Sequence, residues 1–324
     1  MVSTFDLGFA IDGFAPASDI AEQSKAAESG GASIIWIASH LFLRDPITLA
    51  AAALAATKKL KVALMAISPF AIHPVHIAMS AATLEELYPG RVVLCLGAGA
   101  PVDFQAASIN RFHPVKTLCE TIMICRSLFS GEEVFHEGDV FHLQNRKLVN
   151  GPRDIPIVLA ASGPKMLHLA GKKADGVIIS AATSPPFVRN CLDKVRESQG
   201  AKKVWKCGLV YTALNNGNGE SNSSLKKTLA FILRGSHHSE NVQMGGSGLD
   251  QAALKEAYEK KRWDYLEQAM TNEVLSSHAA VGNVIEVCER LISYRAAGLD
   301  HTVINGISDP EKIYSTLQTI IHSI

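Results

Sequence analysis

Short apolar runs alternate with longer amphipathic segments along almost the whole chain. Most of these runs are continuously apolar, which indicates parallel strands that are buried on both faces. Because parallel strands need crossover connections, the pattern predicts right-handed βαβ units and an α/β fold. The predicted strands are residues 5–11, 33–39, 61–67, 91–97, 155–160, 176–180, 203–214 and 301–306.

The segments between these runs carry helix start and stop signals. Asp45 and Pro46 place a capping side chain ahead of a proline in the first helical turn. Two further segments begin on His-Pro, at His73 and His113, and each closes on a glycine. Eight strands joined by helices predict a (β/α)8 TIM barrel, with a doubly wound sheet as the alternative.

Two segments are longer than the βα repeat requires. The first follows the fourth strand and includes residues 131–143, where the turn at 137–139 predicts a hairpin. The second, residues 215–279, follows the seventh strand. It begins with the polar stretch 215–224 and contains the glycine-rich stretch 245–248 ahead of another helical segment. No composition shift marks a boundary, so we expect one domain covering residues 1–324.

Composition limits the class of protein. Basic and acidic side chains number 31 each, so charge gives no reason to expect nucleic acid or a membrane surface as a partner. The sequence start lacks a secretory signal pattern, and the apolar run at 46–56 is far shorter than the ~20 residues of a spanning helix. Six scattered cysteines form no CxxC pair, which predicts reduced, buried thiols in a cytoplasmic protein and no metal site.

Two glycine motifs fail the tests for common catalytic chemistry. Gly97 and Gly99 follow a strand, but Val102 stands where GxGxxG needs its third glycine, which argues against Rossmann-type nicotinamide binding. Leu249 stands where a GxSxG motif around Ser247 needs its last glycine. The second stretch therefore predicts a loop rather than a nucleophile.

The turn after the run at 155–160 leaves a helix N-terminus open. Pro164 fits the first helical position, and Gly163 leaves the N-cap position without a side chain. Free backbone N–H donors, the positive end of the helix dipole and Lys165 then form a potential anion site. A tight connection with Lys165 solvated on the surface is the alternative interpretation.

A second helix start follows the run at 176–180, where Thr183 and Ser184 precede Pro185. In a barrel this start lies next to Gly163 on the same face, so the two together favour an anion site. Ser184 is equally well explained as a plain N-cap. His40 comes just after the second run, at the strand end where barrel enzymes place catalytic groups.

Three stretches, residues 36–101, 155–197 and 279–304, resemble the luciferase-like superfamily of flavin- and deazaflavin-dependent oxidoreductases. The resemblance covers nearly the whole chain apart from residues 215–270. The nearest subgroup is the methylenetetrahydromethanopterin reductase-like enzymes, which use coenzyme F420. The resemblance implies a TIM barrel and hydride transfer between F420 and an organic substrate. An FMN-dependent monooxygenase is the alternative.

The resemblance implies that the cofactor ring lies at the C-terminal mouth of the barrel and that two adjacent loops hold its phosphate-bearing tail. The residues of the two loops are Ala161, Ser162, Gly163, Pro164 and Lys165, and Ala182, Thr183 and Ser184.

The resemblance also implies a cis peptide behind the ring. Deazaflavin-using relatives carry a non-proline cis bond at the end of the third strand, and the bond between Ala66 and Ile67 is the expected one here. Gly97 and Gly99 would let the backbone approach a flat ring, although a tight turn explains them too.

The resemblance places Ser39 and His40 beside the ring and the substrate, with His40 as the proton carrier. Many relatives have Asp-His here, so Ser39 departs from the pattern. Val102 stands where sugar-phosphate dehydrogenases of this group carry a glutamate, which argues against that activity. The expected partners are a small-molecule substrate, held by residues 98–113 and 215–279, and further copies of the chain in a homodimer or homotetramer. A cofactor-storing protein of the same fold is the non-enzymatic alternative.

Overall fold

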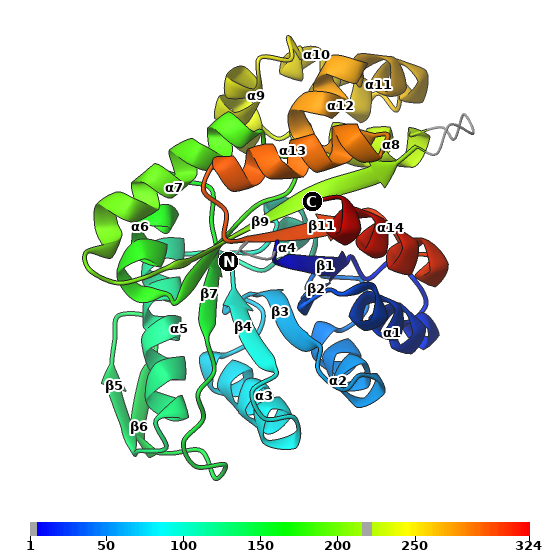
Figure 1. Cartoon of the computed structure of the whole chain (residues 1–324). Coiled ribbons are helices and arrows are strands. Elements are labelled where there is room, and N and C mark those ends of the chain that lie inside the picture. The colour runs from blue at the N-terminus through cyan, green and yellow to red at the C-terminus, as the bar shows by residue number, and fades with distance from the viewer. Residues whose placement is uncertain (1–4, 216–221) are drawn as a thin grey trace.

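The computed structural model describes residues 5–215 and 222–324 (Figure 1), so residues 216–221 of the predicted polar stretch lie outside it. Eight parallel strands pair in the order β1, β2, β3, β4, β7, β8, β9, β11, and β11 pairs with β1 to close the ring. This closure confirms the TIM barrel and excludes an open, doubly wound sheet. The strands are β1 (Leu7–Ile11), β2 (Ile34–Ala38), β3 (Lys61–Ile67), β4 (Val92–Leu96), β7 (Ile157–Ala160), β8 (Gly176–Ile179), β9 (Trp205–Leu214) and β11 (His301–Asn305).

A ring of helices surrounds the barrel (Figure 1). Most of them begin with a proline, whose missing N–H costs nothing in the first turn. Asp45 and Asp309 cap two of these helices by accepting hydrogen bonds from backbone N–H groups. The helices are α1 (Ile20–Gly30), α2 (Pro46–Ala56), α3 (Pro74–Leu87), α5 (Pro114–Phe129), α6 (Pro164–Lys173), α7 (Pro185–Gln199), α13 (Val284–Ala296) and α14 (Pro310–Ser323).

The first long segment contains the predicted hairpin, formed by β5 (Val134–Glu137) and β6 (His142–Arg146). The buried carboxylate of Glu120 on α5 accepts backbone N–H bonds from Asp139, Val140 and Phe141. The hairpin follows α5, so it lies away from the C-terminal ends of the strands. A short helix, α4 (Pro101–Ala106), occupies the loop after β4 at the mouth instead.

The second long segment forms a helical lobe, residues 222–279, which we call the insertion lobe. It has its own buried core, to which Leu233, Leu254 and Met270 contribute. Figure 1 shows the lobe beside α7 and α13. The sequence predicted one helical segment here, whereas the lobe contains α8 (Ser223–Leu233), the 3-10 turn η2 (Ser236–His238), α9 (Ser239–Gly245), α10 (Gln251–Glu259), α11 (Trp263–Ala269) and α12 (Asn272–His278), before β10 (Ala280–Gly282).

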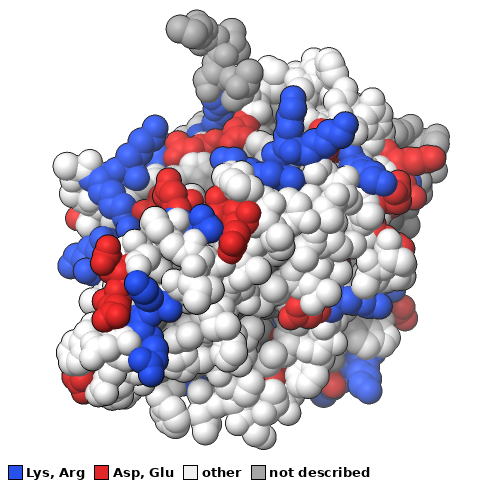
Figure 2. All heavy atoms as spheres, turned by 90° about the horizontal axis from the view of Figure 1, so that it is seen from below, with Lys and Arg blue, Asp and Glu red and all other residues white. Residues whose placement is uncertain are grey.

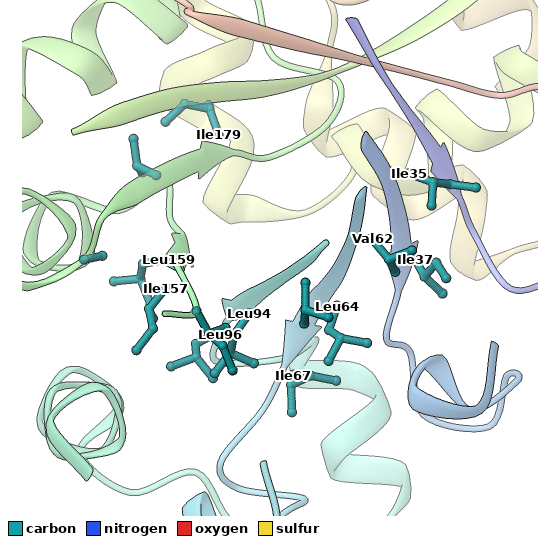
Figure 3. Packing of buried hydrophobic residues seen from close by; sticks show 14 of the residues in the cluster. Ile35, Ile37, Val62, Leu64, Ile67, Leu94, Leu96, Ile157, Leu159 and Ile179 are labelled. Atoms are coloured by element: carbon teal, nitrogen blue, oxygen red, sulfur yellow. The ribbon is translucent and has the colours of Figure 1, made fainter. Parts of the chain in front are cut away.

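The strand side chains divide into two buried layers. One layer points outward and packs beneath the helices (Figure 3), as Ile35, Leu64 and Leu94 do. The other fills the barrel interior, where Ala10, Trp36 and Ala63 lie side by side in register on β1, β2 and β3. Burial on both faces explains why the strands read as continuous apolar runs.

A chain of polar side chains crosses the lower end of the barrel interior. The Trp36 Nε1–H donates to Nε2 of the fully buried His301 over 3.1 Å, so Nε2 is the unprotonated nitrogen. His301 Nδ1 therefore carries the proton and donates it to Asp6 Oδ2 over 2.7 Å. Burial alone would raise the pKa of Asp6, but the hydrogen bonds that it accepts from His301 and Ser33 outweigh burial and lower the pKa below its ordinary value.

Candidate active site at the barrel mouth

Small residues line the mouth between β3, β4 and β7. A Cβ atom placed on Gly97 would lie 2.8 Å from Cβ of Ala66 and 3.5 Å from Cβ of Ala160. Ala66 and Ala160 are half-buried, whereas Cys95, one layer below, is fully buried. The mouth floor here is therefore apolar and accepts no larger side chain at Gly97.

The cis peptide bond lies one residue earlier than predicted. Met65 and Ala66 are joined by a cis bond, and the predicted bond between Ala66 and Ile67 is not cis. The pairing of β3 with β4 shifts register between Leu64 and Ile67, so the irregularity has the predicted location in the strand. The error of one residue arises because its position depends on backbone pairing, which side-chain identity does not record.

His40 lies in the loop after β2, as predicted, and its side chain is exposed. The preceding residue, Ser39, donates its backbone N–H to the carbonyl of Met65, which places it beside the cis bond. Arg44 donates to the carbonyls of Gly13 and Phe14 and so ties this loop to the one after β1. The loop is anchored, while the imidazole is accessible from solvent.

Sequence reasoning missed the pair Asp12 and Tyr211. Burial, together with the nearby charge of Asp12, raises the pKa of Tyr211 to about 12. The alternation of side chains along a strand could have identified this pair. Ala10 and Cys207 point into the barrel interior, and Asp12 and Tyr211 lie an even number of residues further along the same two chain segments, so they point to the same side nearer the mouth. The pair adds a carboxylate and a phenol to the mouth.

The N-terminus of α6 is open, as predicted. Gly163 occupies the N-cap, and a Cβ atom placed there meets no heavy atom within 4 Å. The Gly163 carbonyl accepts the N–H groups of Met166 and Leu167. Pro164 has no N–H, and the backbone N–H of Lys165 has no acceptor within the helix. Gly163 and Lys165 are exposed. This helix start combines a free donor, a dipole end and a cation with open space.

The start of α7 differs from the predicted one. Thr183 and Ser184 are buried, and the Thr183 hydroxyl donates to the carbonyl of Ser180. The Ser184 N–H donates to Asn241 Oδ1 in the insertion lobe, and Pro185 and Pro186 carry no N–H at all. The two hydroxyls therefore face the protein interior rather than an open helix start, because the lobe packs over them.

The two loops nevertheless lie next to each other, as predicted. Ala161 donates its N–H to the carbonyl of Ile178, and Cys191 Sγ on α7 lies 3.9 Å from the carbonyl oxygen of Ser162. The start of α6 therefore packs against α7.

Two buried histidines of the insertion lobe make the lobe sensitive to acid. Burial, with a smaller contribution from the charge of Arg290, lowers the pKa of His278 to about 4 against the opposing effect of its hydrogen bond to Ala182. Burial lowers the pKa of His238 to about 3, with contributions from His237 and His278.

Because the unfolded chain binds protons near pH 6.5 and the folded lobe does not, stability is present above pH 6.5 and is lost as the pH falls toward 4. We expect His278 alone to account for a loss on the order of 3 kcal/mol over that range. Thermal denaturation between pH 7.5 and pH 4.5 measures it. A His278→Gln variant should show a shallower pH dependence, and equal slopes for the two proteins would contradict the assignment.

Comparison with known families identifies the chain. Residues 3–301 match the family model described as luciferase-like monooxygenase, which spans most of the chain. The chain belongs to this family.

Relatives of this luciferase-like chain include F420-dependent enzymes. It is 28% identical over 296 residues to a 5,10-methylenetetrahydromethanopterin reductase of Archaeoglobus fulgidus, covering 89% of each chain. It is 31% identical over 191 residues to an F420-dependent glucose-6-phosphate dehydrogenase of Nakamurella multipartita, covering 54% of this chain and 56% of the relative. A coenzyme F420-dependent tetrahydromethanopterin reductase from Methanopyrus kandleri has the same fold, with a TM-score of 0.89, 20% identity and 99% of each chain covered.

None of the helices described has the length and apolarity that crossing a membrane requires. No cluster of three or more His, Cys, Asp or Glu side chains suited to a metal ion occurs among the residues described.

Proposed function

We propose that this luciferase-like protein is an oxidoreductase that transfers a hydride between coenzyme F420 and an organic substrate. The observation that carries the proposal is the open N-terminus of α6, which presents Gly163 and Lys165 next to a mouth floored by small residues. The relative named as an F420-dependent glucose-6-phosphate dehydrogenase supports it.

The residues present fit such a cofactor. The free donor of Lys165, its ammonium group and the helix dipole suit a phosphate, and no side chain fills the space at Gly163. Ser162, Pro164 and the backbone of Ala161 complete this anion site in the proposal. Ala66 and Gly97 leave room for a flat ring. The other two residues predicted to lie at the ring do not, because the Phe104 ring fills the space beside Gly99 and Ile67 packs in the outward layer beneath the helices.

When bound, the deazaflavin supplies a two-electron hydride carrier. The chain then has to orient the substrate, exclude water and move a proton. Ser39 and His40 lie at the end of β2 on the mouth side, and an imidazole nitrogen of His40 is accessible to exchange that proton. The loop at 98–113, which contains α4, and the insertion lobe flank the substrate in this proposal.

A His40→Ala variant tests the role of the imidazole. We expect kcat to fall roughly 100-fold, because one positioned acid–base group contributes about that much, while the Kd for F420 changes little. Steady-state turnover and a fluorescence titration measure the two quantities. An equal loss of both would remove His40 from proton transfer, and a His40→Gln variant controls for the loss of side-chain volume.

An FMN-dependent monooxygenase is the second candidate, favoured by the description of the family model. Both cofactors carry a phosphate, so the start of α6 suits either one. Titrating the purified apoprotein separately with F420 and with FMN distinguishes the two. Tight binding of F420 alone supports the proposal, and tight binding of FMN alone replaces it with oxygen chemistry. Binding of neither would favour a protein of this fold with another function.

We also propose a homodimer or homotetramer in the cytoplasm. Met79 and Leu87 on α3 are 44% and 63% exposed, and α2 beside it carries no charged residue. Figure 2 shows a broad area almost free of charged side chains on the side where α2 and α3 lie in Figure 1. Burial of such a face against a second copy would remove it from water, and sedimentation equilibrium measures the mass.

Six free cysteines, five of them buried, support the proposed location in the cytoplasm, where thiols stay reduced.

A further inference from the structure

The loop at residues 182–184 is held by side chains that come from outside it. Ala182 is fully buried and has a left-handed backbone with φ of 57°. Its carbonyl lies 2.7 Å from Asn241 Nδ2 and 3.2 Å from His278 Nδ1. Since a carbonyl only accepts, Nδ1 of His278 carries the proton. Two side chains of the insertion lobe therefore donate to one backbone oxygen.

Asn241 makes a second bond to the same loop. Its Oδ1 accepts the N–H of Ser184 over 2.8 Å, so one amide group bridges the carbonyl of Ala182 and the N–H of Ser184. Asn241 is fully buried. On the other side, the Tyr294 hydroxyl on α13 donates to the carbonyl of Thr183. These contacts fix the backbone of all three residues.

The lobe fits against this loop without spare room. A Cβ atom on Gly245, the last residue of α9, would lie 3.0 Å from His278 Nε2 and 3.5 Å from Cβ of Ser184. Within the described part of the chain, His278 Nε2 and Ser184 Oγ are buried and have no hydrogen-bond partner. These two atoms add no bond between the lobe and the loop, so the polar connection consists of the two bonds of Asn241 and the single bond of His278 Nδ1, and Asn241 makes the larger share of it.

We infer that Asn241 is a positioning residue, through which the insertion lobe holds the start of α7 and thereby shapes the anion site at the start of α6. The inference rests on the proposed function. The connection runs through contacts already described, because α7 begins directly after the loop and its Cys191 touches the carbonyl of Ser162. Loss of Asn241 removes the bond to the Ser184 N–H and one of the two bonds to the carbonyl of Ala182, which loosens the start of α7 and the wall beside residues 162–165, while the mouth floor at Ala66 and Gly97 is untouched.

The test separates the tail of the cofactor from its ring. Asn241→Leu removes both hydrogen bonds and keeps the branching of the side chain, and Asn241→Asp keeps an acceptor for Ser184 but replaces the donor to Ala182 with a second acceptor. Fluorescence quenching gives Kd values for F420 and for its chromophore cut back to the ribityl hydroxyl, which lacks the phosphate. We expect Asn241→Leu to weaken F420 binding roughly 10-fold or more and chromophore binding less than about two-fold, with Asn241→Asp intermediate.

Val242→Ala is the matched control, because Val242 is the next residue on α9 and packs in the lobe core instead of bonding to the loop. It should leave both Kd values unchanged. Equal weakening of both ligands by Asn241→Leu, or weakening of neither, would overturn the inference while F420 binding by the unaltered protein stands.

Hydrogen exchange of the Ser184 amide provides a reading that does not need the cofactor. We expect this amide to exchange faster in Asn241→Leu. Its exchange should not change in Asn241→Asp, because the aspartate keeps an acceptor for the Ser184 N–H. Unchanged exchange in Asn241→Leu would overturn the inference on its own. Failure of the unaltered protein to bind F420 overturns the proposed function instead.

Discussion

Gly8→Ala is expected to destabilise the barrel by roughly 3 kcal/mol, the combined cost of overpacking and of a broken buried hydrogen bond. The new methyl group would lie 2.4 Å from Nε2 of His301 and 3.0 Å from Nε1 of Trp36, so it would crowd both atoms of that bond from the side. His301 is held by Asp6 on its other side and Trp36 is fully buried, so neither ring can move away freely. Urea denaturation followed by tryptophan fluorescence measures the loss.

Gly163→Ala is the control for this substitution, since its methyl group meets no atom and its φ of −82° suits alanine. Its cost should be confined to the weaker capping preference of alanine, roughly 1 kcal/mol or less. Equal stability of the Gly8→Ala variant and the unaltered protein would show that the packing around Gly8, His301 and Trp36 is looser than the contacts indicate.

Gly163→Asp is expected to separate stability from cofactor binding. The N-cap backbone is extended, so the aspartate can accept an N–H of the first turn of α6 and should leave the melting temperature equal or raised. The same carboxylate places a negative charge in the space that we assign to the phosphate. We expect the affinity for F420 to fall roughly 100-fold, since charge-assisted bonds to an anion contribute about 2–3 kcal/mol.

Gly163→Asn provides the uncharged comparison, with nearly the same shape and capping ability. Its affinity for F420 should fall less than that of the aspartate variant, and both should melt at similar temperatures. An unchanged Kd for Gly163→Asp would place the phosphate elsewhere and would leave the open start of α6 as a simple connection.

The barrel could be predicted because its strands are buried on both faces. Each run, such as the one from Ile34 to Ala38, is apolar at every position, and the structure buries all five residues. The hairpin could be predicted from its turn residues. The insertion lobe could not be resolved into helices, because α9, α11 and α12 are seven residues each and too short to show a helical period.

The candidate site was predictable where a single stretch carries it and not where distant stretches meet. Gly163 and Pro164 define the open start of α6 by themselves. Asn241 and His278 reach Ala182 across 59 and 96 residues, and no local pattern marks either side chain as buried. Pro185 and Pro186 did carry a readable signal, since consecutive prolines remove two of the N–H donors that an anion would need.

The short strand β10 pairs in parallel with the end of β9, with Ala280 opposite Thr212, and Gly282 accepts the N–H of Asn215 over 2.8 Å. Both ends of the insertion lobe thus leave the barrel from neighbouring strands. In evolution a segment of another length could therefore replace the lobe without changing how the barrel closes. The barrel frame would stay the same when the lobe changes, provided that each replacement still offers a donor to the carbonyl of Ala182.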